Sequence, residues 1–306
     1  MIKSKGLGLS VAASWAWGTS LVVGMEIAQT KGLAAWFIWA TANALTLALF
    51  GWLVRCGLLS RRVYDMKPVK AAAIVIQAFC LIIQMNIINK VIMQMGGSEG
   101  LAYAVATATG VIFTLWMYRH GLKTSVITDK FQWVITLVVI SAILLVGLLD
   151  GVPRVVYPAS TKADILWGVW SACILFAGPI GDVQHWQRGE ISPRGYFTGA
   201  AWFAVYMLLI LAMSSMHFNG VMNALLLVAV LCVTSSTIDS IAVAMHEVSS
   251  KKAGTLLALF LCVFWGVFAK IGVIELWSHA GIYRVGFAVA IIAVALRIRE
   301  VEKWRS

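Results

Sequence analysis

Ten apolar runs follow one another along the 306-residue chain, each about as long as a membrane is thick. A helix needs roughly 20 apolar residues to cross the hydrocarbon core of a bilayer. Because helices satisfy their own backbone hydrogen bonds in lipid, these runs predict membrane-spanning helices. The expected spans are about 7–29, 33–54, 69–94, 99–118, 124–150, 164–187, 195–216, 221–247, 253–274 and 281–298.

The composition supports the same class of protein. The chain is 61% hydrophobic and 12% charged, and this charged share is about half that of a soluble domain. Short polar hinges separate the runs, and no loop is long enough to form a soluble domain. We therefore expect an all-α polytopic membrane protein with ten transmembrane helices in a single domain, 1–306.

The positions of the basic residues predict the orientation, because Lys and Arg concentrate in cytoplasmic loops. With the N-terminus inside, 18 of the 24 basic residues fall in inner loops and tails. The others lie on the outer side or at span ends: Lys31, Lys90, Arg154, Lys162, Lys270 and Arg284. We expect a multi-pass protein of the cell membrane (inner or plasma membrane) with both termini cytoplasmic. The net charge of +11 then reflects topology, so no nucleic-acid partner is expected, and the oligomeric state is left open.

Ten spans divide into two halves of five, about 7–150 and 164–298. An odd number per half makes the second half enter the membrane in the opposite sense, which predicts a 5+5 inverted repeat with broken helices 1 and 6. Span one carries Gly18 within Ser14-Trp15-Ala16-Trp17-Gly18-Thr19-Ser20, and span six carries Gly178-Pro179-Ile180-Gly181. Proline removes an amide donor and glycine permits unusual torsions, so a helix can open at these places.

One apolar run contains an unusual polar segment, Thr234-Ser235-Ser236-Thr237-Ile238-Asp239-Ser240. Unpaired polar groups in hydrocarbon are costly, so these should face the bundle interior, an ion or a water-filled path. A dehydrated hard cation takes oxygen ligands such as hydroxyls and freed backbone carbonyls. The alternative is that the hydroxyls bond the carbonyl four residues back, which is common in membrane helices.

Four stretches of the chain resemble the sodium–solute symporters, the family that includes sodium-coupled sugar and proline carriers. Their order and spacing hold over nearly the whole chain, and the family has a five-plus-five inverted-repeat fold of the leucine-transporter type. The stretches are Ser10-Val11-Ala12-Ala13-Ser14-Trp15-Ala16-Trp17-Gly18, the segment 121–132 (GLKTSVITDKFQ), Gly181-Asp182-Val183-Gln184-His185-Trp186-Gln187-Arg188 and Ser236-Thr237-Ile238-Asp239-Ser240.

The resemblance implies a sodium site between the first and eighth spans. Carried over residue by residue, its ligands are the backbone carbonyls of Ala13, Ala16 and Val233 and the hydroxyls of Ser236 and Thr237. Asp129 falls on a position that some members use for a further cation near the cytoplasmic side. Asp239 lies nearly on one face with Ser236, and it would ligate the ion, hold a ligand in place or line the inner exit.

A solute pocket is expected between the interruptions of spans one and six. Its expected residues are Trp15, Trp17, Gly18, Gln77, Gln84, Trp170, Gly178 and Asp182. Aromatic rings there can stack on a flat or cationic solute. Gln77 and Gln84 share a helix face, and they would contact polar solute groups or join helices by hydrogen bonds. His185 would gate the path or carry a proton, with a packing histidine as the alternative.

The function expected is a sodium-coupled secondary transporter (symporter) that imports a small solute by alternating access, with Na⁺ as the coupling ion. No catalytic constellation is present, since His246-Glu247 lacks the second histidine of a zinc motif, and we expect no enzyme. Two alternatives remain: a proton-coupled carrier that depends on Asp239 or Asp129, and a carrier-like sensor or accessory subunit that binds without transport. The sequence does not name the solute.

Overall fold

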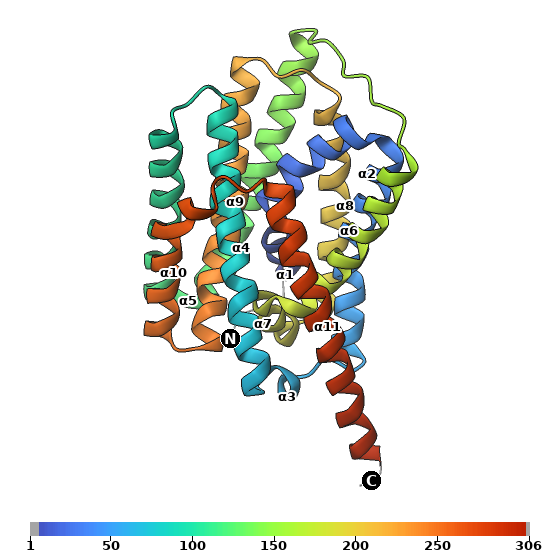
Figure 1. The fold of residues 1–306 in the computed structure, drawn as a ribbon, viewed down its shortest axis with the longest axis vertical. Coiled ribbons are helices and arrows are strands. Elements are labelled where there is room, and N and C mark those ends of the chain that lie inside the picture. The colour runs from blue at the N-terminus through green and yellow to red at the C-terminus, as the bar shows by residue number, and fades with distance from the viewer. Residues whose placement is uncertain (1–5, 304–306) are drawn as a thin grey trace.

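The computed structural model describes residues 6–303, which form a bundle of helices (Figure 1). The elements are α1 (Leu7–Trp15), α2 (Gly18–Arg55), α3 (Arg61–Tyr64), α4 (Lys67–Gln94), α5 (Glu99–Leu149), α6 (Lys162–Gly181), α7 (Val183–Ile191), α8 (Arg194–Ser214), α9 (Gly220–Val248), α10 (Lys251–Phe264), the 3₁₀ helix η1 (Trp265–Phe268) and α11 (Val273–Lys303). Within this range there is no strand, only an isolated bridge between Arg154 and Met216. The expected all-α class is confirmed for the described residues.

Eight helices in the described range are long and apolar enough to cross a membrane. They are α2, α4, α5, α6, α8, α9, α11 and the continuous segment formed by α10 and η1. Their length and composition confirm a polytopic membrane protein. Two of them, α2 with 38 residues and α5 with 51, are longer than one crossing requires.

The two longest helices each bend at a glycine. The torsion φ is 79° at Gly32 in α2 and 68° at Gly121 in α5. Residues with a Cβ adopt this left-handed region only at a cost, so glycine allows the chain to change direction here. At Gly32 a Cβ would also lie 2.3 Å from the carbonyl oxygen of Pro158. The bends fall at the expected boundaries between spans one and two and between spans four and five.

Both expected helix interruptions are present. Helix α1 ends at Trp15 and α2 begins at Gly18, and Trp17 between them has extended torsions. The second interruption is at Asp182, whose extended backbone separates α6 from α7. Pro179 stays inside α6, so this helix opens three residues after its proline rather than at it.

The short helices α1 and α7 lie inside the bundle, between the longer helices (Figure 1). Eight of the nine residues of α1 and seven of the nine of α7 are buried. Close packing of α1 on α8 requires glycine, because a Cβ at Gly8 would lie 2.2 Å from the hydroxyl oxygen of Thr198. Polar side chains on α1 and α7 are therefore held away from lipid, where they can meet each other.

Candidate functional site

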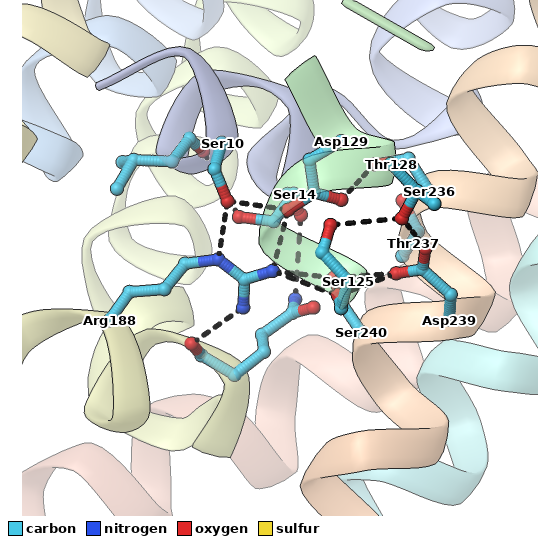
Figure 2. A network of polar contacts seen from close by, with 12 residues as sticks. Ser10, Ser14, Ser125, Thr128, Asp129, Arg188, Ser236, Thr237, Asp239 and Ser240 are labelled. Atoms are coloured by element: carbon cyan, nitrogen blue, oxygen red, sulfur yellow. Dashed lines mark hydrogen bonds and ion pairs between the residues drawn. The ribbon is translucent and has the colours of Figure 1, made fainter. Parts of the chain in front are cut away.

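A fully buried ion pair joins α7 to α5. The Arg188 Nη2 atom lies 2.7 Å from Asp129 Oδ2, and neither side chain is exposed. The same guanidinium donates from Nε to Ser10 Oγ on α1 (3.0 Å) and from Nη2 to Ser240 Oγ on α9 (2.9 Å). Figure 2 shows Arg188 reaching into the space between these helices. One side chain therefore connects α1, α5, α7 and α9.

Asp129 is the point where α1 and α9 meet. The Ser10 hydroxyl donates to Asp129 Oδ2 at 2.5 Å, and the Ser236 hydroxyl donates to Asp129 Oδ1 at 2.7 Å. Ser236, expected as a sodium ligand, thus lies against the carboxylate expected to serve a further cation (Figure 2). The first interrupted helix and the polar segment of α9 are neighbours.

Asp239 is a second buried carboxylate in the same network. It accepts hydrogen bonds from the hydroxyls of Ser125 (2.8 Å), Thr128 (2.7 Å) and Ser240 (3.2 Å). Arg188 reaches it only indirectly, because its Nη2 donates to the hydroxyl oxygens of Ser125 and Ser240. Two carboxylates thus share one guanidinium, and with both ionised these three groups carry one net negative charge. Burial of such a charge is costly unless a cation or proton compensates it.

The end of α1 offers backbone carbonyls. Within residues 6–303, no backbone amide donates to the carbonyl oxygens of Ala13 or Ala16. The amide of Trp17, which would reach Ala13 in a continuous helix, instead donates to the carbonyl of Trp15 at 2.8 Å. Carbonyls freed at a helix end need another donor or a cation. Ala13 and Ala16 therefore have the chemistry that a sodium site requires.

The other expected sodium ligands differ from one another. The Thr237 hydroxyl donates to the carbonyl of Val233 at 3.0 Å, which is the back-bonded arrangement considered from the sequence, whereas Ser236 bonds across to α5. Both hydroxyl oxygens keep lone pairs that can face a cation. The oxygen donors of this region suit Na⁺, and Ser236 is the more directly connected of the two to the buried charges.

A second buried ion pair lies at the other helix interruption. Asp182, in the break between α6 and α7, accepts from Arg284 Nη2 on α11 at 3.2 Å to each carboxylate oxygen. The same nitrogen lies 2.9 Å from Cys80 Sγ on α4, and the guanidinium carbon lies 4.3 Å from the centre of the Trp17 ring. This cluster therefore joins the two interruptions, since Trp17 occupies the break between α1 and α2.

Several buried polar atoms around this second pair have no hydrogen-bond partner in the described residues. The amide of Gly18 donates to Gln84 Oε1 at 3.1 Å, which brings Gln84 to the break in the first helix. Gln77 and Cys80 lie one turn apart on α4, the helix that also carries Gln84. The unpartnered atoms are Trp17 Nε1, Gln77 Nε2 and Oε1, Gln84 Nε2 and Arg284 Nε. Since buried polar groups are normally paired, these atoms indicate where a polar ligand can bind.

Trp15 and Gly178 hold the two interrupted helices together. A Cβ at Gly178 would lie 2.4 Å from Trp15 Cη2, so only glycine admits the ring. The Trp15 indole nitrogen donates to the carbonyl of Asn43 at 3.1 Å. Both residues were expected to line a solute pocket, and in the structure they pack against each other.

Two other residues were expected at the site. His185 packs beside this contact, whereas Trp170 lies apart from it. The His185 ring packs edge-on against Trp15 with 5.3 Å between ring centres, and its Nδ1 lies 3.2 Å from the Tyr196 hydroxyl. This is the packing arrangement considered from the sequence. Trp170 is 41% exposed on α6, so the structure does not bring it to the buried residues with which it was grouped.

An ion-pair cluster connects α3 to α7 and α9 at the lower end of the bundle in Figure 1, where α3 lies. Arg61 contacts Asp65 at 3.0 Å, Glu190 on α7 at 3.0 Å and Glu247 on α9. Lys70 contacts Asp65 at 2.9 Å. The hydrogen bond from Lys70, and then that from Arg61, hold the pKa of Asp65 below its usual value.

Sequence reasoning misplaced the two arginines. Arg188 was counted as a cytoplasmic residue and Arg284 as lying on the outer side or at a span end, yet they are 0% and 3% exposed. The available signal was that each lies close to or within an apolar run, where an ionisable residue is a functional candidate. Leaving both out, 17 basic residues stay on the expected inner side and five on the outer.

The stretches that resemble sodium–solute symporters converge in the structure. They contribute every residue labelled in Figure 2: Ser10, Ser14, Ser125, Thr128, Asp129, Arg188, Ser236, Thr237, Asp239 and Ser240. No protein-family model and no curated protein sequence matches the chain. Membership of the symporter family therefore stays a prediction, supported by the residues themselves.

Proposed function

We propose that the chain is a sodium-coupled symporter that imports a small solute by alternating access. The observation that carries the proposal is the meeting of an interrupted helix with a buried network of net negative charge. The break after α1 frees the carbonyls of Ala13 and Ala16, and Ser10 and Ser236 join α1 and α9 through Asp129. Interrupted helices that present backbone groups to ions are typical of secondary transporters.

The proposal includes a finer topology. Counting each half of α2 and α5 as a span, with α1 joined to the first half of α2, makes ten spans. The two interruptions then fall in spans one and six, the corresponding positions of repeats 7–150 and 164–298. The basic residues indicate that the α3 end of the bundle faces the cytoplasm. Both termini would then lie on the cytoplasmic side of a cell membrane.

In this mechanism the cation and the solute stabilise the same closed conformation. Na⁺ binds between α1 and α9, while the solute binds beside Trp17, Gln84 and Asp182. A ligand shifts a conformational equilibrium only through its differential affinity, and the coupling between two ligands is reciprocal. Inward movement of one charge gains about 2.3 kcal/mol per 100 mV of membrane potential.

A proton-coupled carrier is the second candidate, and a specific observation favours it. Asp239 has hydroxyl donors but contacts Arg188 only through Ser125 and Ser240. A proton on Asp239 would compensate the network as well as Na⁺ does. Uptake driven by a pH gradient in sodium-free buffer, and lost in Asp239→Asn, would identify this variant. Solute binding without accumulation in liposomes would instead indicate a sensor or accessory subunit.

The test uses sodium itself as the probe. In detergent, NaCl should raise the unfolding temperature relative to choline chloride, because a ligand at 100 times its Kd stabilises by about 2.7 kcal/mol. The double variant Ser236→Ala/Thr237→Ala should lose this shift and still fold. Thr234→Val is the matched control, since the Thr234 hydroxyl bonds only back to α9 carbonyls. An unchanged sodium shift in the double variant would argue against the site.

A further inference from the structure

The cluster around Arg284 contains more hydrogen-bond donors than acceptors. Four nitrogen donors are buried there without a partner: Trp17 Nε1, Arg284 Nε and the amide nitrogens of Gln84 and Gln77. The orientation of Gln84 is fixed, because its Oε1 already accepts from the Gly18 amide at 3.1 Å. Only Gln77 offers an unpartnered oxygen as well as a nitrogen. A ligand that satisfies these groups must supply mainly acceptors.

These donors are close together. The Arg284 guanidinium lies over the Trp17 ring at 4.3 Å, and Gln84 contacts Gly18, the next residue along the chain. The side chains of Trp17, Gln84 and Arg284 are 3%, 0% and 3% exposed. They come from α4, α11 and the first helix break, three elements that meet at this cluster.

The charge of the cluster excludes a strong preference for a cation. Asp182 is the carboxylate that would attract one, and Arg284 Nη2 already lies 3.2 Å from both of its oxygens. The paired groups sum to zero, while the unpartnered edge of Arg284 presents a positive N–H. Hydrogen bonds to an ionised acceptor are roughly twice as strong as those between neutral groups.

A second observation favours the same sign of charge. A cavity of about 360 Å³ between α5, α7, α9 and α10 is lined by Arg119, His120 and Lys251, together with Gln187 of α7. Its one carboxylate, Glu247, is held by Arg61. Basic groups that line a cavity raise the local concentration of anions.

We propose that the solute carries a carboxylate, which binds Arg284 Nε, Trp17 Nε1 and the Gln84 amide. An ionised carboxylate has acceptors only, on two oxygens, and so matches this donor set. The inference rests on the proposed transport function, because it assigns the chemistry of the solute in that same pocket. Asp182 stays paired with Arg284, so binding requires no exchange of ion-pair partners.

The test compares acids with their amides. Acetate, pyruvate, succinate, glycine and benzoate are titrated against the detergent-solubilised full chain in NaCl and in choline chloride. Each is compared with its amide, which lacks the carboxylate charge, and thermal unfolding is the readout. At least one acid should stabilise the protein while its amide does not. Trp17→Phe, which keeps a ring below Arg284 but removes the N–H, should weaken that acid about tenfold to hundredfold.

Trp36→Phe is the matched control, because Trp36 Nε1 is also buried and unpartnered but lies in the second half of α2. Trp36→Phe should change the affinity for the acid by less than about twofold relative to the wild type. Equal binding of an amide, no shift with any of the five acids, or equal losses in the two Phe variants would overturn the inference. If an acid binds equally well with and without sodium, the carboxylate inference holds and the proposed symporter function is contradicted. If only amides bind, and only with sodium, the symporter function is supported and the carboxylate inference is wrong.

Discussion

The two buried arginines have similar burial but different surroundings. Arg188 lies among hydroxyls and shares two carboxylates, Asp129 directly and Asp239 through serines. Arg284 has one carboxylate, Asp182, together with a thiol and the face of an indole ring. The first cluster has excess negative charge and paired donors, whereas the second is neutral and has unpaired donors.

This difference teaches what each cluster can do. A buried network in which the charged groups are hydrogen-bonded fixes the positions of the helices that supply it, and its surplus charge attracts a cation or proton. A neutral pair flanked by unpartnered N–H groups holds less of the fold together and has capacity left for a ligand. The Arg188 cluster is thus the structural and ion-binding centre, and the Arg284 cluster is the solute-binding candidate.

The largest expected effect is the loss of stability when each of the two arginines is replaced by alanine. Arg188→Ala removes the cation from two buried carboxylates, and loss of one partner of a buried pair costs about 3–5 kcal/mol. Arg284→Ala isolates only Asp182 and should cost less. Chemical unfolding in detergent measures both. Equal losses, or a larger loss for Arg284→Ala, would remove the structural distinction between the clusters.

A compensating variant separates lost charge from lost packing. Arg188→Met with Asp129→Asn removes both charges of the closest pair and keeps side chains of similar length, so most of the stability should return. If the double variant is as unstable as Arg188→Ala, the guanidinium acts through its bonds to Ser10, Ser240 and Gln184 rather than through its charge.

Much of the fold could be predicted from the sequence, because hydrocarbon imposes simple rules. Run length and composition predicted membrane-spanning helices, and glycine and proline marked the interruptions near residues 16–17 and 182. Local chemistry sufficed for these features.

The partners of the buried charges could not be predicted in the same way. Pairing of Arg188 with Asp129, or of Arg284 with Asp182, joins residues 59 and 102 positions apart. Such pairing depends on how helices pack, and a positive charge near a span end has the same appearance in sequence whether it faces water or the bundle interior. The sequence also could not decide whether the Thr237 hydroxyl bonds back to the carbonyl of Val233 or faces a cation. The structure shows the bond to Val233.

The next prediction concerns the contact between the two interruptions. Gly178→Ala puts a methyl group 2.4 Å from Trp15 Cη2, and such overpacking should cost about 1–3 kcal/mol. Gly286→Ala on α11 is the control, since its Cβ would meet nothing within 4 Å. Unfolding curves of the two variants test this. Equal stability would mean that the Trp15 ring moves aside freely and does not fix the breaks.

A smaller effect tests whether the cation binds at the Arg188 cluster and not at the Arg284 cluster. Asp239→Asn removes the surplus negative charge from the Arg188 cluster, and it should weaken sodium stabilisation about tenfold, equivalent to about 1.4 kcal/mol. Asp182→Asn leaves that cluster intact and should change the sodium midpoint by less than about twofold. Titration of thermal stability with NaCl gives both midpoints. The reverse ranking would place the cation at the second cluster.

The smallest effect provides an exposed pair for comparison with the two buried ones. Lys70 and then Arg61 hold the pKa of Asp65 below its usual value, so this carboxylate stabilises the folded state above its unfolded pKa of about 3.9, and the contribution is lost as pH falls through the lower folded value. Because the Asp65 side chain is 43% exposed, water and salt screen the interaction. Stability of the wild type should therefore decline slightly more than that of Asp65→Asn below about pH 4, and less so at high salt. Parallel pH curves at low salt would mean that Arg61 closes this end through Glu190 and Glu247 alone.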